Sequence, residues 1–108
     1  MAVGDDEIEF VKDLFAQVGE ITTRKMMGGL SIYADSKIFS MMRDDGRLYI
    51  KAAGPLAERL EAAGGILFTY DKKNGKQGHM NYLTLPEAAL DDPEAACEWA
   101  KASLDANY

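Results

Sequence analysis

The chain has 108 residues, and its composition excludes several classes of protein. Hydrophobic residues make up 47% and charged residues 28%, a balance typical of one globular domain with a single core. No apolar stretch approaches the ~20 residues of a membrane-spanning helix, and the N-terminus lacks the basic and apolar regions of a secretory signal. The single cysteine, Cys97, agrees with a reducing compartment. We therefore expect one cytoplasmic domain over residues 1–108, with no membrane association.

The formal net charge of −6 is distributed unevenly along the chain. Residues 1–20 and residues 87–108 each carry six acidic residues and one basic residue, whereas residues 21–53 carry six basic and three acidic residues. Domains that bind DNA alone are usually basic overall or carry a dense basic stripe, because neutralising phosphates supplies most of the non-specific affinity. We therefore expect DNA binding to be weak or indirect.

The first half of the chain predicts a helix followed by a meander of strands. Apolar residues at helical spacing and an acidic first turn predict a helix over residues 5–18, which Gly19 ends. Residues 21–29 are interpreted as the approach to the sheet. Asp35-Ser36 and Asp44-Asp45-Gly46 are typical of the turns that join antiparallel strands. The three predicted strands are residues 30–34, 37–43 and 47–52.

Proline and glycine residues divide the second half into a helix, a hairpin and a last helix. Pro55 suits the first turn of a helix, and Gly64-Gly65 suits its end. Asn74-Gly75 is a strong turn signal between two strands, and Pro93 opens the last helix. The predicted elements are a helix at 55–63, strands at 66–70 and 77–85, and a helix from 94 to about 106. The order α-β-β-β-α-β-β-α predicts an α+β domain in which three helices pack on an antiparallel five-stranded sheet.

Short motifs in a fixed order along the chain carry a family resemblance. They are Arg24-Lys25-Met26-Met27-Gly28-Gly29, Ile32-Tyr33-Ala34-Asp35 leading to Ile38-Phe39, Leu48-Tyr49-Ile50-Lys51, Phe68-Thr69-Tyr70, and Met80-Asn81-Tyr82 followed by Leu85-Pro86. Together they resemble the TfoX/Sxy N-terminal domain family, named for regulators of competence-specific genes in bacteria. The resemblance implies a fold similar to that of type III secretion chaperones, and it covers the chain from the first helix to the Trp99 region.

The chain also departs from the pattern of that family. The family commonly has phenylalanine where Met27 stands and glycine where Ser36 stands. Because Ser36 disfavours a tight turn with two positive φ values, we expect a turn of another type there. Full competence regulators resembling this chain carry a second, helical C-terminal domain, whereas this chain ends at Tyr108. We therefore expect action through a partner rather than direct transcriptional activity.

A candidate partner-binding surface begins at the glycine pair. Adjacent glycines permit positive φ values and close approach of another chain or ligand at the entrance of a strand. The basic pair before them could join cations from a neighbouring strand. A solvated surface with ion pairs worth ~0–1 kcal/mol is the alternative reading of these cations. The candidate residues are Arg24, Lys25, Met26, Met27, Gly28, Gly29, Arg47 and Lys51.

Other chemistry-bearing residues give weaker signals. Lys72, Lys73 and Lys76 at a hairpin tip could contact nucleic-acid phosphates, or could simply favour solubility. His79 is the only histidine, so neither a metal cluster with histidine spacing nor a Cys97–His79 nucleophile pair is expected, and no cofactor motif is present. The acidic pairs at 5–6, 44–45 and 91–92 suit helix caps and turns.

Methionines are frequent, and they can line surfaces that adapt to several partners. Most of them are expected in the core. Strict alternation along residues 37–43 places Ile38, Ser40 and Met42 on one face and Phe39 and Met41 on the other. The alanine-rich last helix with Trp99 is a second candidate contact surface.

The leading hypothesis is a non-enzymatic protein-interaction module. The resemblance implies a link to bacterial gene regulation, with a transcription regulator as partner, which for full-length relatives would be the cyclic-AMP receptor protein. A homodimer is also compatible with the sequence. One alternative is direct nucleic-acid binding through the basic strands and residues 72–76. Another is an enzyme or small-ligand carrier with a pocket between sheet and helices, lined by Tyr33, Tyr49 or Tyr82.

Overall fold

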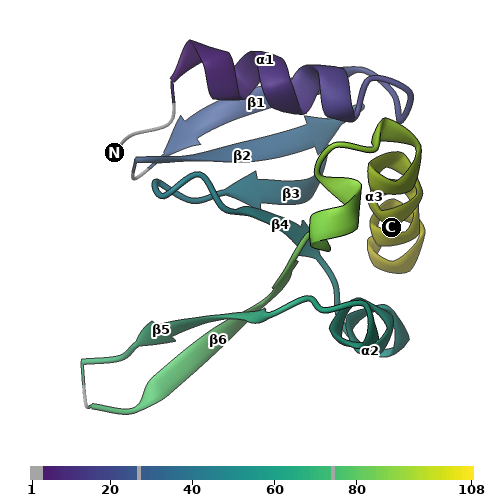
Figure 1. The fold of residues 1–108 in the computed structure, drawn as a ribbon. Coiled ribbons are helices and arrows are strands. Elements are labelled where there is room, and N and C mark those ends of the chain that lie inside the picture. Colours follow the sequence, from purple (N-terminus) through teal and green to yellow (C-terminus); the bar gives the residue numbers. More distant parts are fainter. Residues whose placement is uncertain (1–3, 27, 74) are drawn as a thin grey trace.

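The computed structural model describes residues 4–26, 28–73 and 75–108 (Figure 1). Over these residues it confirms an α+β fold with three α-helices and an antiparallel sheet. The elements in chain order are α1 (Asp5–Leu14), β1 (Ile21–Met26), β2 (Gly29–Ala34), β3 (Lys37–Met42), β4 (Leu48–Lys51), α2 (Pro55–Ala62), β5 (Leu67–Asp71), β6 (Gln77–Thr84), the 3-10 turn η1 (Glu87–Ala89) and α3 (Pro93–Asn107).

In the described part of the chain the sheet has six strands, so the prediction of five was wrong. The missing strand is β1, which pairs along its whole length with β2, from Ile21 opposite Ala34 to Met26 opposite Gly29. Its isoleucine and threonines favour extended backbone. The strand order is β1-β2-β3-β4-β6-β5, so β1 and β5 form the two edges. The basic pair Arg24-Lys25 lies inside an edge strand, not in an approach to the sheet.

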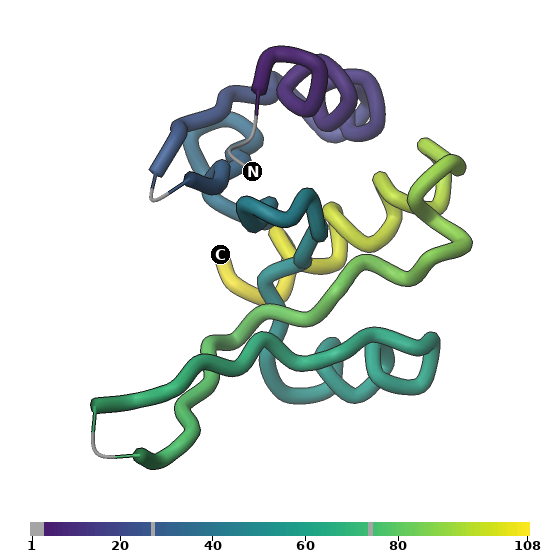
Figure 2. The backbone as a smooth tube through the Cα atoms, turned by 60° about the vertical axis from the view of Figure 1, so that its left-hand side comes forward, coloured from purple at the N-terminus to yellow at the C-terminus, as the bar shows by residue number. Residues whose placement is uncertain are grey.

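The three helices pack on one face of this sheet. One buried cluster joins Val11 of α1, Leu60 of α2 and Ala100 of α3 with residues of the strands. Phe15, directly after α1, belongs to the same cluster. The β5–β6 hairpin extends away from this body, as Figures 1 and 2 show. We call this hairpin, residues 67–84, the arm. Because the arm projects beyond the helices, much of its surface lacks a core beneath it.

A β-bulge in β3 changes which side chains reach the core. Ile32 pairs with Ser40, but Tyr33 pairs with Ile38, so Phe39 is the extra residue between them. The bulge lets both Phe39 and Met42 enter the buried cluster, because an extra residue shifts the alternation of side chains. The prediction that Phe39 and Met42 lie on opposite faces was therefore wrong.

The turn between β2 and β3 also differs from the prediction. Asp35 and Ser36 both have positive φ values, 49° and 71°, the signature of a two-residue turn that matches the twist of a hairpin. The Asp35 side chain accepts a hydrogen bond from the Glu20 backbone N–H at 3.1 Å. Serine therefore occupies the tight turn for which glycine is better suited.

Ser36→Gly is expected to stabilise the protein by about 0.5–1 kcal/mol. Glycine removes a left-handed penalty of about 1–2 kcal/mol, and its greater freedom in the unfolded chain offsets part of this gain. Urea unfolding followed by circular dichroism measures the change. Asp35→Gly is the matched control, since it relieves the same backbone penalty but removes the hydrogen bond to Glu20. A destabilised Ser36→Gly protein would contradict the argument.

The helices begin and end close to the predicted residues, except at the end of α1. Helix α1 ends at Leu14, earlier than predicted, and a turn covers residues 15–18. In α3 the small residues Ala96 and Ala100 are buried against the sheet, so this side of the helix is already covered. Trp99 is half-buried with the Arg59 guanidinium 5.4 Å from its ring centre. Within residues 4–26, 28–73 and 75–108, no helix has both the length and the apolarity to cross a bilayer.

Candidate protein-interaction site

The face of the sheet opposite the helices carries a row of side chains from separate strands. Arg24 pairs with Ser31, Ser31 with Met41, and Met41 with Tyr49. Residues directly opposite each other in an antiparallel sheet point to the same side, and this row alternates with the core residues Leu30, Ile32 and Ile50. We call this surface the open face.

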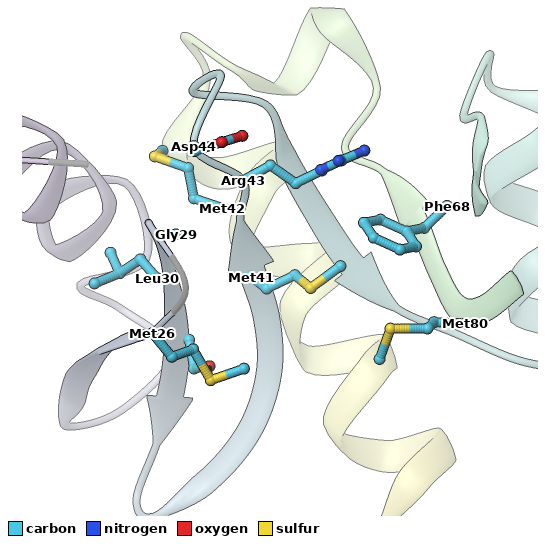
Figure 3. Close-up of a pocket in the computed structure, with 10 residues that line it drawn as sticks. Met26, Gly29, Leu30, Met41, Met42, Arg43, Asp44, Phe68 and Met80 are labelled. Atoms are coloured by element: carbon cyan, nitrogen blue, oxygen red, sulfur yellow. Dashed lines mark hydrogen bonds between the residues drawn. The ribbon is translucent and has the colours of Figure 1, made fainter. Parts of the chain in front are cut away.

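A groove of about 300 Å³ lies on the open face between the β1–β2 turn and the arm (Figure 3). Apolar residues dominate the described lining. Met26, Met41 and Met80 line it from the open face, whereas Met42 and Leu30 belong to the buried cluster beneath it. Figure 3 shows Met41 and Met80 pointing toward each other, with Phe68 above them and Met26 across the groove. The residues lining this methionine groove are Met26, Gly29, Leu30, Ser31, Met41, Met42, Arg43, Asp44, Phe68 and Met80.

Several contacts order the wall of the groove. The Phe68 ring meets Tyr49 edge to face, with 5.3 Å between centroids, and this contact joins the arm to the body of the sheet. The Arg43 guanidinium lies 4.7 Å from the Phe68 ring centre, a distance at which a cation is attracted to an aromatic face. On the other side, the Ser31 hydroxyl donates to Met26 Sδ at 3.2 Å. The Arg43 cation thus lies beside an apolar hollow.

Gly29, the second residue of the glycine pair, is required for steric reasons. A Cβ at this position would lie 2.5 Å from the Met42 carbonyl oxygen, which is backbone and cannot turn aside. Gly28 has a different role, because its φ of +80° lies in the region that glycine adopts most readily. The pair therefore closes the β1–β2 turn tightly against β3.

The predicted partner-binding residues are only partly brought together. Met26 and Gly29 line the methionine groove, and Arg24 shares its face. Lys25 pairs with Leu30, a core residue, and so lies on the helix side. The strand β4 is not a neighbour of β1, since β2 and β3 lie between them. Met27 lies outside the described residues.

The two cations near β4 have other surroundings. Arg47 precedes β4, and its backbone N–H donates to Asp45. It lines a separate shallow hollow with Gly46 and Ile66. Lys51 Nζ lies 5.2 Å from the ring centre of Tyr108. Neither residue lines the methionine groove, so the surface predicted from the sequence is not one continuous patch.

The lysines of the alternative nucleic-acid site lie at the tip of the arm. A hydrogen bond from the Lys72 N–H to the Lys76 carbonyl, 2.8 Å long, closes this end, and Gly75 has a φ of +80°. The Lys72 side chain passes close to Gly78, where a Cβ would meet its Cε at 2.6 Å. Asn74 of the predicted Asn-Gly turn lies outside the described residues. Arg24 stands across the sheet on the β1 edge, so these cations do not converge on one site.

His79 and Cys97 occupy unrelated positions. His79 is an exposed residue of β6, as predicted for a strand residue, and it pairs with Thr69. Cys97 is buried, and its Sγ contacts the Leu14 carbonyl at 3.4 Å. In the part of the chain that the structure describes, no three histidine, cysteine or acidic residues gather where they could hold a metal ion. The acidic residue Asp92 caps α3 by accepting from the Ala95 N–H.

Tyr82 on the open face has a perturbed phenol. Burial raises its pKa above the ordinary value of 10.0, and the phenols of Tyr108 and Tyr33 add to the shift by charge repulsion. The folded state therefore favours the neutral form of Tyr82. The stability that this neutral phenol contributes is fully present below the pKa of the unfolded chain, near 10. This stability is lost as the pH rises through the higher pKa of the folded protein.

Tyr82→Phe is expected to reduce the fall in the free energy of unfolding above about pH 10. Phenylalanine keeps the ring but has no proton to lose. Urea titrations at a series of alkaline pH values measure the slope for both proteins. Tyr70→Phe on the exposed part of β5 is the control. Equal slopes for Tyr82→Phe and the unchanged protein would show that Tyr82 does not contribute.

The sequence showed that methionines are frequent, but it did not predict that Met41 and Met80 would form a site with Met26. Most methionines were expected in the core, whereas of the described ones only Met42 belongs to the buried cluster. Met26 and Met80 are 53% and 44% exposed, so that expectation was wrong. Arg43, Asp44 and Phe68 were not singled out as site residues. In the sequence, Arg43 and Asp44 mark a turn, and Phe68 belongs to a motif of the family resemblance; neither signal indicates a shared groove.

Similarity to known proteins agrees with the motifs. The family model described as the TfoX N-terminal domain matches residues 13–107 of this chain. The chain belongs to this family. It is also 36% identical over 78 residues to the DNA transformation protein TfoX1 of Aliivibrio fischeri (strain ATCC 700601 / ES114). That match covers 72% of this chain but 34% of the relative, so the chain spans about a third of the length of this TfoX relative.

Proposed function

We propose that this TfoX N-terminal domain is a non-enzymatic protein-interaction module that acts through a protein partner in bacterial competence regulation. The observation that carries the proposal is the methionine groove on the open face, which exposes Met26 and Met80. Exposed methionines and a nearby arginine are typical of protein contact sites. The regulatory context comes from the relative named for DNA transformation.

The site chemistry supports binding more than catalysis. A general base and a nucleophile must lie within hydrogen-bond reach of each other or of a substrate. Among its described residues, the methionine groove offers one cation and one carboxylate, Arg43 and Asp44, in a mainly apolar lining. Such a lining suits recognition of an apolar surface with few polar contacts.

Direct nucleic-acid binding is less well supported by the arrangement of charge. The net charge is −6, and the candidate cations extend from β1 at one edge to the arm at the other. Phosphate-led affinity requires several cations along one path. We expect no binding of duplex DNA by fluorescence anisotropy at ~50 mM salt. Saturable binding under that condition would favour the nucleic-acid alternative.

The partner hypothesis is tested in the native cell extract. The tagged full chain, purified after nuclease treatment, should retain a protein at a constant molar ratio, and cells lacking that protein should lose the effect of the chain on transformation frequency. Recovery of the bare chain in repeated experiments, or an unchanged effect in cells lacking the recovered protein, would contradict the proposal.

A further inference from the structure

Large apolar side chains are exposed around the methionine groove. Met26 on β1 and Met80 on β6 lie on two sides of the methionine groove. Their strands are separated by three others in the sheet, yet their side chains line one hollow (Figure 3). The exposed Tyr70 continues along the arm. Apolar side chains grouped around one hollow are a stronger indication of a contact site than single exposed residues.

The shape and composition of the groove favour a helix as the bound element. Methionine side chains adapt to irregular apolar surfaces, and grooves that receive amphipathic helices take side chains from one helical stripe. The groove has a volume of about 300 Å³. Such a hollow can receive the side chains that anchor a bound helix, whereas a flat partner surface would leave it unfilled. Met41 forms its floor between the two more exposed methionines (Figure 3).

The charges around the groove specify the partner further. Arg43 lies over Phe68 at the rim, and Arg24 stands on the same face beside Ser31. Asp44 is the acidic residue in the lining. Arginines placed beside an apolar surface favour carboxylates in the ligand, because they form strong charge-assisted hydrogen bonds.

The same charges disfavour a second copy packed face to face. Such a dimer would place the arginines of two open faces near each other, and like charges across an interface are costly. The acidic helices α1 and α3 lie on the opposite side of the sheet from the groove. In a face-to-face dimer, the helices of one copy therefore could not contact the groove of the other. A partner with its own acidic helix fits both the apolar lining and the cationic rim.

We propose that the methionine groove binds an acidic amphipathic helix of a partner protein. This inference deepens the proposed function by naming the partner's chemistry, and it rests on that function. The apolar stripe of the helix enters between Met26, Met41 and Met80. Its carboxylates meet Arg43 and Arg24.

Three synthetic helical peptides test the proposal against the full chain. The first has leucines at i, i+3, i+4 and i+7 in an alanine and glutamate background. The second replaces glutamate by lysine, and the third replaces leucine by alanine. We expect the first peptide to bind best by fluorescence anisotropy, more weakly as salt rises, and to shift the methyl NMR signals of Met26, Met41 and Met80.

Paired variants then separate the apolar and the charged contributions. Met26→Gln with Met80→Gln should weaken binding of the first peptide by about tenfold, whereas Phe10→Gln should not, although Phe10 is 41% exposed on α1. Arg24→Glu with Arg43→Glu should reverse the preference toward the lysine peptide. Lys12→Glu, an exposed residue of α1, is the charge control. Circular dichroism checks that each variant is folded.

Several results would overturn the inference. They are equal binding of the glutamate and lysine peptides, unchanged affinity in the folded methionine variant, and methyl shifts confined to residues outside the groove. Concentration-dependent methyl shifts without peptide, with a dimer mass by light scattering that the methionine variant loses, would assign the groove to a second copy and also refute it. If the methionine variant still retains the native partner, the proposed function stands and only the groove assignment fails.

Discussion

Replacing Phe39 by alanine is expected to lower the free energy of unfolding by about 3–5 kcal/mol. Phe39 is fully buried, and its ring meets Phe15 edge to face with 5.0 Å between centroids and 89° between ring planes. The bulge turns this side chain into the core, where it joins the sheet to the turn after α1. Alanine would remove the apolar contact and leave a cavity that rigid neighbours fill only in part.

Urea unfolding by circular dichroism measures this loss, and Phe68→Ala is the control. Phe68 is half-buried on the open face, so its truncation should cost less than that of Phe39. A double-mutant cycle with Phe15→Ala and Phe39→Ala should give an interaction energy of about 0.5–1.5 kcal/mol between the two rings. A loss below about 1 kcal/mol for Phe39→Ala would show that the bulge side chain is not a core element.

Elements with local signals could be predicted from the sequence. Helix α2 begins at Pro55 and ends before Gly64, because proline suits a first helical turn and glycine suits the region after the last one. The N–H of Gly65 donates to the Leu60 carbonyl at 2.7 Å and closes that end. Such signals act within a few residues, and they need no knowledge of the rest of the fold.

Features set by distant contacts could not be predicted in this way. Strand β1 has no fully buried residue, so it lacks the buried alternation that marks a strand, and its pairing with β2 alone defines it. The bulge at Phe39 likewise depends on the register of β3 against β2. A strictly alternating pattern could not predict it, because one extra residue reverses the faces.

The methionine groove illustrates the same limit for the site. Its lining comes from β1, β2, β3, the turn after β3, β5 and β6. These segments meet because β4 pairs with β6 rather than with the next strand in the chain. The methionines could be noted in the sequence, but their shared exposure follows from a sheet order that no local pattern encodes. The motif Met26 to Gly29 therefore predicted one wall and missed the opposite one.

Gly29→Ala is expected to cost stability toward the upper end of about 1–3 kcal/mol. The added Cβ would lie 2.5 Å from the Met42 carbonyl oxygen and 3.5 Å from the Arg43 Cα. Since both neighbours are backbone atoms, β2 and β3 must move apart at the turn that forms one wall of the methionine groove. The cost is steric overlap between strands, not a forbidden φ value, and urea unfolding by circular dichroism should detect it.

Gly46→Ala is the matched control for the steric argument. Gly46 has a φ of +85°, but a Cβ there would meet no atom within 4 Å, so only the left-handed penalty of about 1–2 kcal/mol applies. Gly29→Ala should also shift the methyl signals of Met26 and Met41, whereas Gly46→Ala should leave them unchanged. If Gly29→Ala unfolds at the same urea concentration as the unchanged protein, the close approach of β2 to β3 does not constrain the fold, and only Gly28 of the glycine pair has a structural role.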